Sequence, residues 1–149
     1  MSQTRIVRRL VLLCAALVVA LWTARADAGF VFVKNVKNPT PKQSKAAIKG
    51  VFSGRTKTWS NGETIILVIG SEDAPAMTWI AETHFGISAK TYLSKIKQDV
   101  FKGDVPRPLS ADDDAKTVKR VQSGPGVVGI VSDAAVGSLP SDVVVLAVE

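Results

Sequence analysis

Apolar and polar positions alternate along the chain with two periods, one typical of strands and one typical of helices. The run 64–69 is β-branched and apolar on both faces, which is typical of a strand that helices cover on both sides of a sheet. Three further strands are expected at 30–34, 126–132 and 143–148. We expect the run 64–69 to lie centrally in the sheet.

Four helices are expected between these strands, because apolar residues recur there three and four positions apart. They span 42–52, 75–85, 88–100 and about 110–124. Ser110 and Asp113 resemble a capping box at the start of the fourth helix, and Gly54 and Gly86 are the expected ends of the first two. The order of elements predicts an α/β fold of three layers. A mostly parallel sheet carries helices on both faces, and its final strand can run antiparallel at an edge.

The first 28 residues follow a different pattern. Three arginines within 5–9 precede the apolar run 10–22, and Ala26-Asp27-Ala28 closes it. This arrangement predicts a secretory signal peptide that is cleaved after Ala28, and therefore a periplasmic or secreted protein with a single domain at 29–149. A retained membrane anchor is the alternative, but the run is shorter than the roughly 20 residues that span a bilayer as a helix.

Cysteine and charge content exclude several classes of site. The single cysteine, Cys14, lies in the predicted signal peptide, so residues 29–149 have neither a disulfide nor a thiol nucleophile. The whole chain has a formal net charge of +6, but the first 28 residues hold 4 of the 19 basic and 1 of the 13 acidic residues, which leaves +3 for the remainder. Lysines are scattered and aromatic residues do not lie between them, which argues against nucleic acid as a partner.

Individual candidate residues have structural explanations that compete with functional ones. His84 is expected to be a polar surface or helix-end residue, and Trp59 a core or surface aromatic residue. A helix start explains Asp112, Asp113 and Asp114, and no ring of further ligands indicates a metal site. The sequence has no nucleophile elbow, zinc motif or phosphate-loop pattern, so we expect neither an enzyme nor a cofactor.

Two longer segments resemble a known family. The run IKGVFSGRTKTWSNGETIILVI resembles the segment of periplasmic phosphate-binding proteins in which a helix ends in I-F-x-G-K and continues to a tryptophan and a strand. The later run VFKGDVPRPLSADDDAKTVKRVQSGPGVVGIVS resembles the family's F-x-G…P loop, helix and P-G-x-I-G-Y strand. The resemblance covers roughly residues 30–133, and Ile130 or Val131 stands in place of the usual tyrosine.

The resemblance implies both a fold and a ligand. The family members are substrate-binding components of phosphate ABC transporters, and their type II periplasmic-binding-protein fold holds phosphate between two lobes. Residues 29–149 have room for one such lobe. In the family, an Arg-Ser-Asp-Gly-Ser-Gly-Thr pattern after the strand matched by 64–69 surrounds the anion with amides, hydroxyls and a helix N-terminus. This chain has GSEDAPA at 70–76, which keeps Ser71 but lacks the arginine and most of the hydroxyls.

Two functions stay open on this basis. The first is weak binding of phosphate or another small anion by a single lobe, alone or as a homodimer. Its ligand-binding residues would be Ser71, Thr78, Ser53 and Arg55. The second is a non-catalytic protein-interaction module that keeps the fold but has lost the phosphate site, with an ABC transporter, an envelope protein or a second copy as partner.

Overall fold

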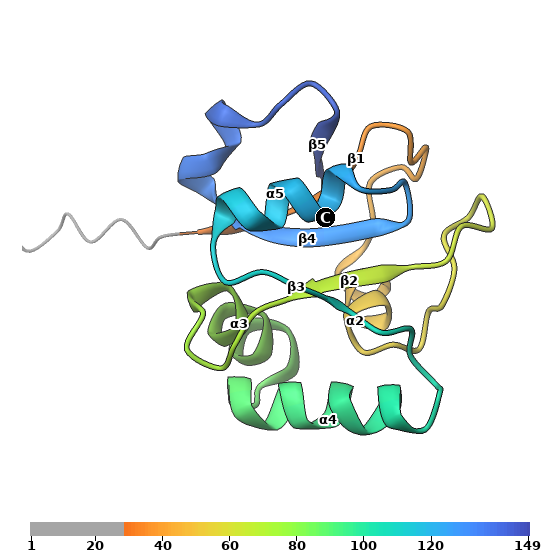
Figure 1. Cartoon of the computed structure of the whole chain (residues 1–149), viewed down its shortest axis with the longest axis vertical. Helices are drawn as coiled ribbons and strands as arrows, with labels where there is room; N and C mark the ends of the chain where they lie inside the picture. Colours follow the sequence, from red (N-terminus) through yellow and green to blue (C-terminus); the bar gives the residue numbers. More distant parts are fainter. Residues whose placement is uncertain (1–28) are drawn as a thin grey trace, which may run out of the picture.

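Runs of β-branched residues form the strands of one five-stranded sheet at the centre of the structure, which describes residues 29–149 (Figure 1). In this computed structural model the strands are β1 Phe30–Asn35, β2 Ile66–Ile69, β3 Leu109–Ser110, β4 Val127–Ser132 and β5 Val143–Leu146. They lie in the order β3-β2-β4-β1-β5. The predicted signal peptide lies outside the described residues.

The direction of β1 corrects one prediction about the sheet. β2 runs parallel to β3 and β4, as expected, whereas β1 runs antiparallel to β4 on one side and to β5 on the other. β5 is an edge strand, as predicted, but it runs in the same direction as β2, β3 and β4, and β1 is the strand that opposes the other four. β2 lies inside the sheet, and the central position belongs to β4. The pattern of a short strand does not encode its direction, so the sequence could not identify β1 as the reversed one.

The predicted helices form, with shifted ends. They are α2 Lys45–Phe52, α3 Pro75–Ile80, α4 Ala89–Phe101 and α5 Asp114–Gln122. α3 continues into a π-helical turn, η1 Ala81–Phe85, and a 3-10 turn, η2 Asp133–Ser138, follows β4. Gly54 and Gly86 follow the ends of α2 and η1 with positive φ angles of 77° and 64°, which confirms both predicted helix ends.

Side-chain caps set the helix starts. Ser44 and Ser88 cap α2 and α4 by accepting the N–H three residues further on. The cap of α5 is Asp113 and not Ser110, because the carboxylate of Asp113 accepts the N–H of Lys116. Ser110 instead belongs to β3, which pairs with β2 and which the surrounding prolines concealed in the sequence.

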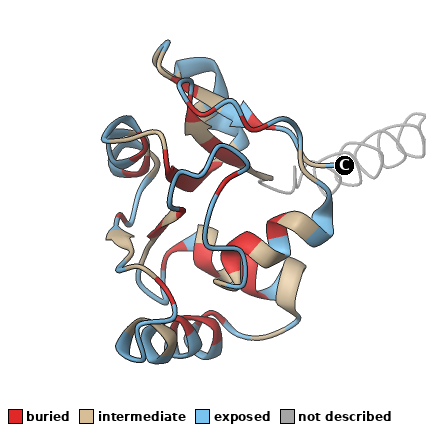
Figure 2. Cartoon of the chain, turned by 90° about the vertical axis from the view of Figure 1, so that its right-hand side faces the viewer, coloured by how far each residue is buried: buried red, intermediate tan, exposed pale blue. Residues whose placement is uncertain are grey.

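Helices cover both faces of the sheet, as predicted. α2, α3 and α4 pack against one face, and α5 with η2 packs against the other (Figure 1). Neighbouring β1 residues divide between the two cores, since Phe32 faces α2–α4 and Val33 faces α5. Figure 2 shows that buried residues are concentrated in the sheet and on the inward faces of the helices. The three-layer α/β architecture is therefore confirmed.

Trp59 is a core residue, one of its two predicted roles. Its side chain is 4% exposed, and its Nε1–H donates to the carbonyl oxygen of Gly126 at 3.0 Å. The same oxygen accepts the N–H of Ile66 at 3.0 Å. Trp59 thus joins the loop after α2 to the starts of β2 and β4.

His84 is a helix-end residue, as predicted, but it also belongs to an aromatic cluster. Its ring meets that of Trp79 edge-on, with 5.3 Å between centroids, and that of Phe32 at 5.6 Å. Burial lowers the pKa of His84, and the nearby ammonium groups of Lys45 and Lys49 lower it further. His84 is half-buried, so part of its ring packs in the aromatic cluster.

His84 is expected to titrate below its ordinary pKa of 6.5 in the folded protein. As the pH falls below about 6.5, the unfolded chain then binds more protons than the folded one, and the free energy of unfolding decreases. The pKa can be measured from the NMR signals of the imidazole ring as the pH is changed. These signals belong to His84, because the chain has one histidine. A His84→Gln variant should lose this part of the pH dependence, and titration at or above 6.5 contradicts the prediction.

Candidate functional site

The carboxyl ends of three neighbouring strands meet at one edge of the sheet. β2, β3 and β4 run in the same direction and continue into α3, α5 and η2. Ligands in open α/β sheets bind outside the carboxyl ends of strands. A cavity of about 360 Å³, the carboxyl-edge cavity, lies here. Its acidic lining consists of Asp112, Asp113 and Asp114, and Phe30 and Pro75 contribute to its apolar lining.

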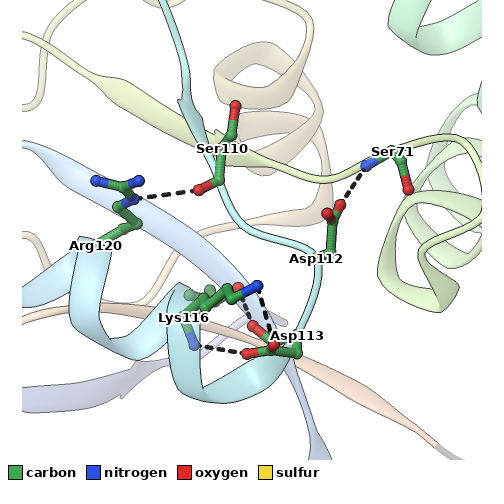
Figure 3. Close-up of polar contacts among 7 residues, drawn as sticks. Ser71, Ser110, Asp112, Asp113, Lys116 and Arg120 are labelled. Carbon is green, nitrogen blue, oxygen red and sulfur yellow. Dashed lines mark hydrogen bonds and ion pairs between the residues drawn. The ribbon is translucent and has the colours of Figure 1, made fainter.

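A carboxylate of the chain itself binds the loop that follows β2. The backbone N–H of Ser71 donates to Oδ1 of Asp112 at 2.7 Å (Figure 3). The loop packs so closely that a Cβ on Gly70 would lie 2.8 Å from the Cβ of Ala74 and 3.0 Å from the carbonyl oxygen of Ala111. Glycine permits this close approach. The Ser71 amide therefore already has an anionic acceptor supplied by the chain itself.

Asp113 and Asp114 satisfy donors at two other places around the same cavity. Asp113 accepts the N–H of Lys116 at 2.8 Å, and its carboxylate lies 3.8 Å from the ammonium of that lysine (Figure 3). Asp114 accepts the N–H of Ser132 at 3.1 Å and the hydroxyl of Ser132 at 2.5 Å. These bonds tie the start of α5 to the end of β4. Three consecutive aspartates thus act as intramolecular anions for three separate sets of donors.

This arrangement disfavours a bound anion in the carboxyl-edge cavity. The described residues that line the cavity include three carboxylates and no lysine, arginine or histidine. A bound anion would therefore find no cationic side chain in this lining. It would also meet charges of its own sign. The chemistry of the cavity is acidic and apolar.

Sequence reasoning recognised only part of this arrangement. A helix start explains Asp113, which is the cap of α5. The hydrogen bonds of Asp112 and Asp114 reach partners 41 and 18 positions away along the chain, which a local pattern does not reveal. The sequence does contain one signal of these bonds. A helix start needs one capping side chain, and this one has three consecutive carboxylates, so two of them can accept hydrogen bonds from other parts of the chain.

Ser71 is the only predicted ligand residue that lines one of the three cavities described here. It lies in a groove of about 600 Å³, which we call the polar groove. Three segments line this groove: the loop that follows β2, the strand β3 and the helix α4. Lys90 and Lys97 of α4 line the polar groove together with Glu72 and Asp112, so its charges are mixed. Its surroundings are therefore more polar than those of the carboxyl-edge cavity.

The other three predicted ligand residues are separate from Ser71. Thr78 is half-buried on α3. The hydroxyl of Ser53 donates to the carbonyl oxygen of Gly50 at 3.1 Å, at the end of α2, and Arg55 is exposed beyond it. These residues line none of the three cavities, so the structure does not bring the predicted set together.

A third cavity, about 380 Å³ in volume, has a mainly apolar lining. We call it the apolar groove, and its lining includes Phe30, Trp79, Thr83, His84 and Val145. It lies between the first residues of β1, the end of the chain from position 145 onward and the helix α3–η1. The pairing of β1 with β5 ends one residue beyond Val145, which leaves the start of β1 without a strand on that side.

Residues 29–149 offer neither a cluster of metal ligands nor a membrane-spanning helix. No group of three or more histidine, aspartate or glutamate side chains in this range is arranged to hold a metal ion. No helix in it combines the length and apolar character that crossing a bilayer requires.

The chain matches no protein-family model and no curated protein in sequence. Its fold, however, resembles solved structures. An ABC-type phosphate transport receptor from Vibrio cholerae aligns with a TM-score of 0.59 and 17% identity, over 81% of this chain and 46% of that chain. PstS from Borrelia burgdorferi aligns with a TM-score of 0.63 and 8% identity, over 82% and 47%. The chain spans less than half the length of these two proteins, and it has the α/β fold of one lobe of PstS-type binding proteins.

Proposed function

We propose that this protein is a non-catalytic protein-interaction module, which keeps the fold of one binding-protein lobe and carries its own carboxylates in place of a bound anion. The hydrogen bond from the Ser71 N–H to Asp112 supports this function most strongly. In the family that the sequence resembles, the corresponding loop surrounds phosphate. In this chain the Ser71 amide of that loop already has a negatively charged acceptor.

A binding role agrees with the similar structures and with the predicted export of the chain. The Vibrio cholerae protein is a phosphate transport receptor, a description that names binding and not a reaction. After removal of the predicted signal peptide, the module acts in the periplasm or outside the cell. Its partner is an ABC transporter, another envelope protein or a second copy of the chain.

The apolar groove is the surface best suited to a protein contact. Trp79 and Val145 both line it, and the side chain of Val145 is 38% exposed. Removal of apolar surface from water favours association, and tryptophan is enriched among residues that dominate binding energy. Lys45 at the same groove adds a positive charge.

We expect Asp112 to prevent phosphate from binding at the Ser71 amide. In a protein that consists of residues 29–149, addition of phosphate to millimolar concentration should leave the NMR signal of this amide unchanged. In an Asp112→Ala variant the amide loses its acceptor and the nearby negative charge, so the signal should move, with a Kd in the millimolar range, roughly 4 kcal/mol of binding free energy. Circular dichroism should show that the variant keeps its fold.

An Asp104→Ala variant is the matched control, since Asp104 is exposed and lies outside all three cavities. It should behave as the unmodified protein does. Phosphate binding to the unmodified protein at the Ser71 amide, with a sub-millimolar Kd, contradicts the proposed function.

Weak anion binding in the polar groove is a second candidate function. It is favoured by the presence of Ser71, Lys90 and Lys97 in the lining of one groove, although Glu72 and Asp112 offset the charge of the lysines. Phosphate or sulfate binding by the unmodified protein that disappears in a Lys90→Gln, Lys97→Gln double variant would favour this candidate. Binding that survives both substitutions places the anion elsewhere.

Contact through the apolar groove predicts selective cross-linking. Residues 29–149 contain no cysteine, so Thr83→Cys introduces a single thiol at the groove, which can carry a photoreactive cross-linker. In the cell envelope of a producing bacterium, this variant should give a cross-linked adduct of one discrete mass. An adduct with twice the mass of the chain would identify a second copy as the partner. Lys119→Cys on α5 is the control and should give no such adduct. Equal cross-linking at both positions, or at neither, counts against the proposal.

A further inference from the structure

The first described residue, Gly29, lies against a carboxylate. Its carbonyl oxygen accepts the backbone N–H of Asp133 at 2.9 Å. A Cβ built on Gly29 would lie 2.0 Å from Oδ2 of Asp133, so this side chain occupies the space that a larger residue at position 29 would need. The ion pairs within residues 29–149 join Lys42 to Glu149 and Lys116 to Asp113. Asp133 therefore has no cationic partner in that range.

Gly29 also follows the bond at which the sequence predicts cleavage. Ala26 and Ala28 place small residues in the A-x-A arrangement that signal peptidases recognise. The sequence pattern indicates where the chain is cleaved, and the packing shows which group lies beside the residue that follows the cleaved bond.

We propose that a signal peptidase hydrolyses the Ala28–Gly29 bond and that the new α-ammonium group of Gly29 forms an ion pair with Asp133. Hydrolysis breaks the amide bond between the carbonyl carbon of Ala28 and the nitrogen of Gly29. Water supplies a hydroxyl to the carbon and a hydrogen to the nitrogen. At neutral pH the carboxyl group loses a proton and the amine gains one, so Ala28 leaves as a carboxylate and Gly29 becomes a cation.

The ion pair would fasten the beginning of β1 to the end of β4. Phe30 pairs with Ser132 in the antiparallel ladder, and Asp133 is the next residue after Ser132. Ser132 is itself bound by Asp114, so the pair would extend a series of polar contacts along this edge. Before cleavage the nitrogen of Gly29 is an uncharged amide. Processing would therefore add one positive charge beside the acidic carboxyl-edge cavity.

The cleavage site is tested first. The full chain, with its own first 28 residues, is produced in a bacterial host that exports proteins, and the intact mass of the exported product is measured. The expected mass is that of residues 29–149. A mature product that begins at any other residue overturns the proposal.

A double-mutant cycle tests the ion pair. Two forms are prepared with a removable N-terminal tag. After removal of the tag, one form begins at Gly29 and the other at Ala28. In the form that begins at Ala28, the α-ammonium lies one residue, about 3.8 Å, further along the chain from Asp133. Asp133→Asn should lower the Tm of the Gly29 form by about 2–4 °C, as expected for loss of an exposed ion pair in a domain of this size. The same substitution should lower the Tm of the longer form by less than half as much.

Asp104→Asn serves as the control and should leave the Tm of both forms unchanged. Equal effects of Asp133→Asn on the two forms overturn the ion pair, even where the cleavage site is as expected. The inference depends on the predicted signal peptide and not on the proposed function. Its failure would therefore leave the phosphate and cross-linking experiments unaffected.

Discussion

The close packing of α5 on β4 is the constraint on which the rest of the structure depends. A Cβ on Gly129 of β4 would lie 2.6 Å from the Cγ2 of Thr117 and 3.2 Å from the Cγ2 of Val121, both on α5. Because the helix lies this near the strand, its first turn reaches the end of β4, where Asp114 binds Ser132. The residue before the cap, Asp112, then reaches across to the loop after β2. The acidic character of the carboxyl edge is thus a consequence of helix packing.

Much of the fold could be predicted from the sequence because its signals are local. The two-sided apolar run that forms β2, the serine cap of α4 and the glycine at the end of α2 each act within a few residues. The reversed direction of β1 and the short strand β3 could not be predicted, since both depend on pairing with distant segments. The same distinction applies to the site. Asp113 acts locally and was recognisable, whereas Asp112 and Asp114 act through the tertiary structure.

A fold shared with phosphate receptors does not carry their chemistry with it. The similar structures agree with this chain in the arrangement of its elements at identities of 17% and 8%, which leaves most side chains free to differ. In residues 70–76 the side chains differ from the pattern that the resemblance implies. The backbone N–H of Ser71 remains, and the Asp112 carboxylate of the same chain accepts its hydrogen bond. Loss of a ligand can in this way be accommodated without exposing unpaired polar groups.

The three aspartates at the start of α5 are consecutive in the sequence. A segment of three residues therefore controls the polarity of an entire edge of the sheet, while the hydrophobic cores that hold the sheet and helices together lie elsewhere. Amino-acid changes in this segment would alter the charge of the edge, and each would also remove a hydrogen bond that holds α5 or the loop after β2. The charge of this edge and the attachment of its elements therefore depend on the same three side chains.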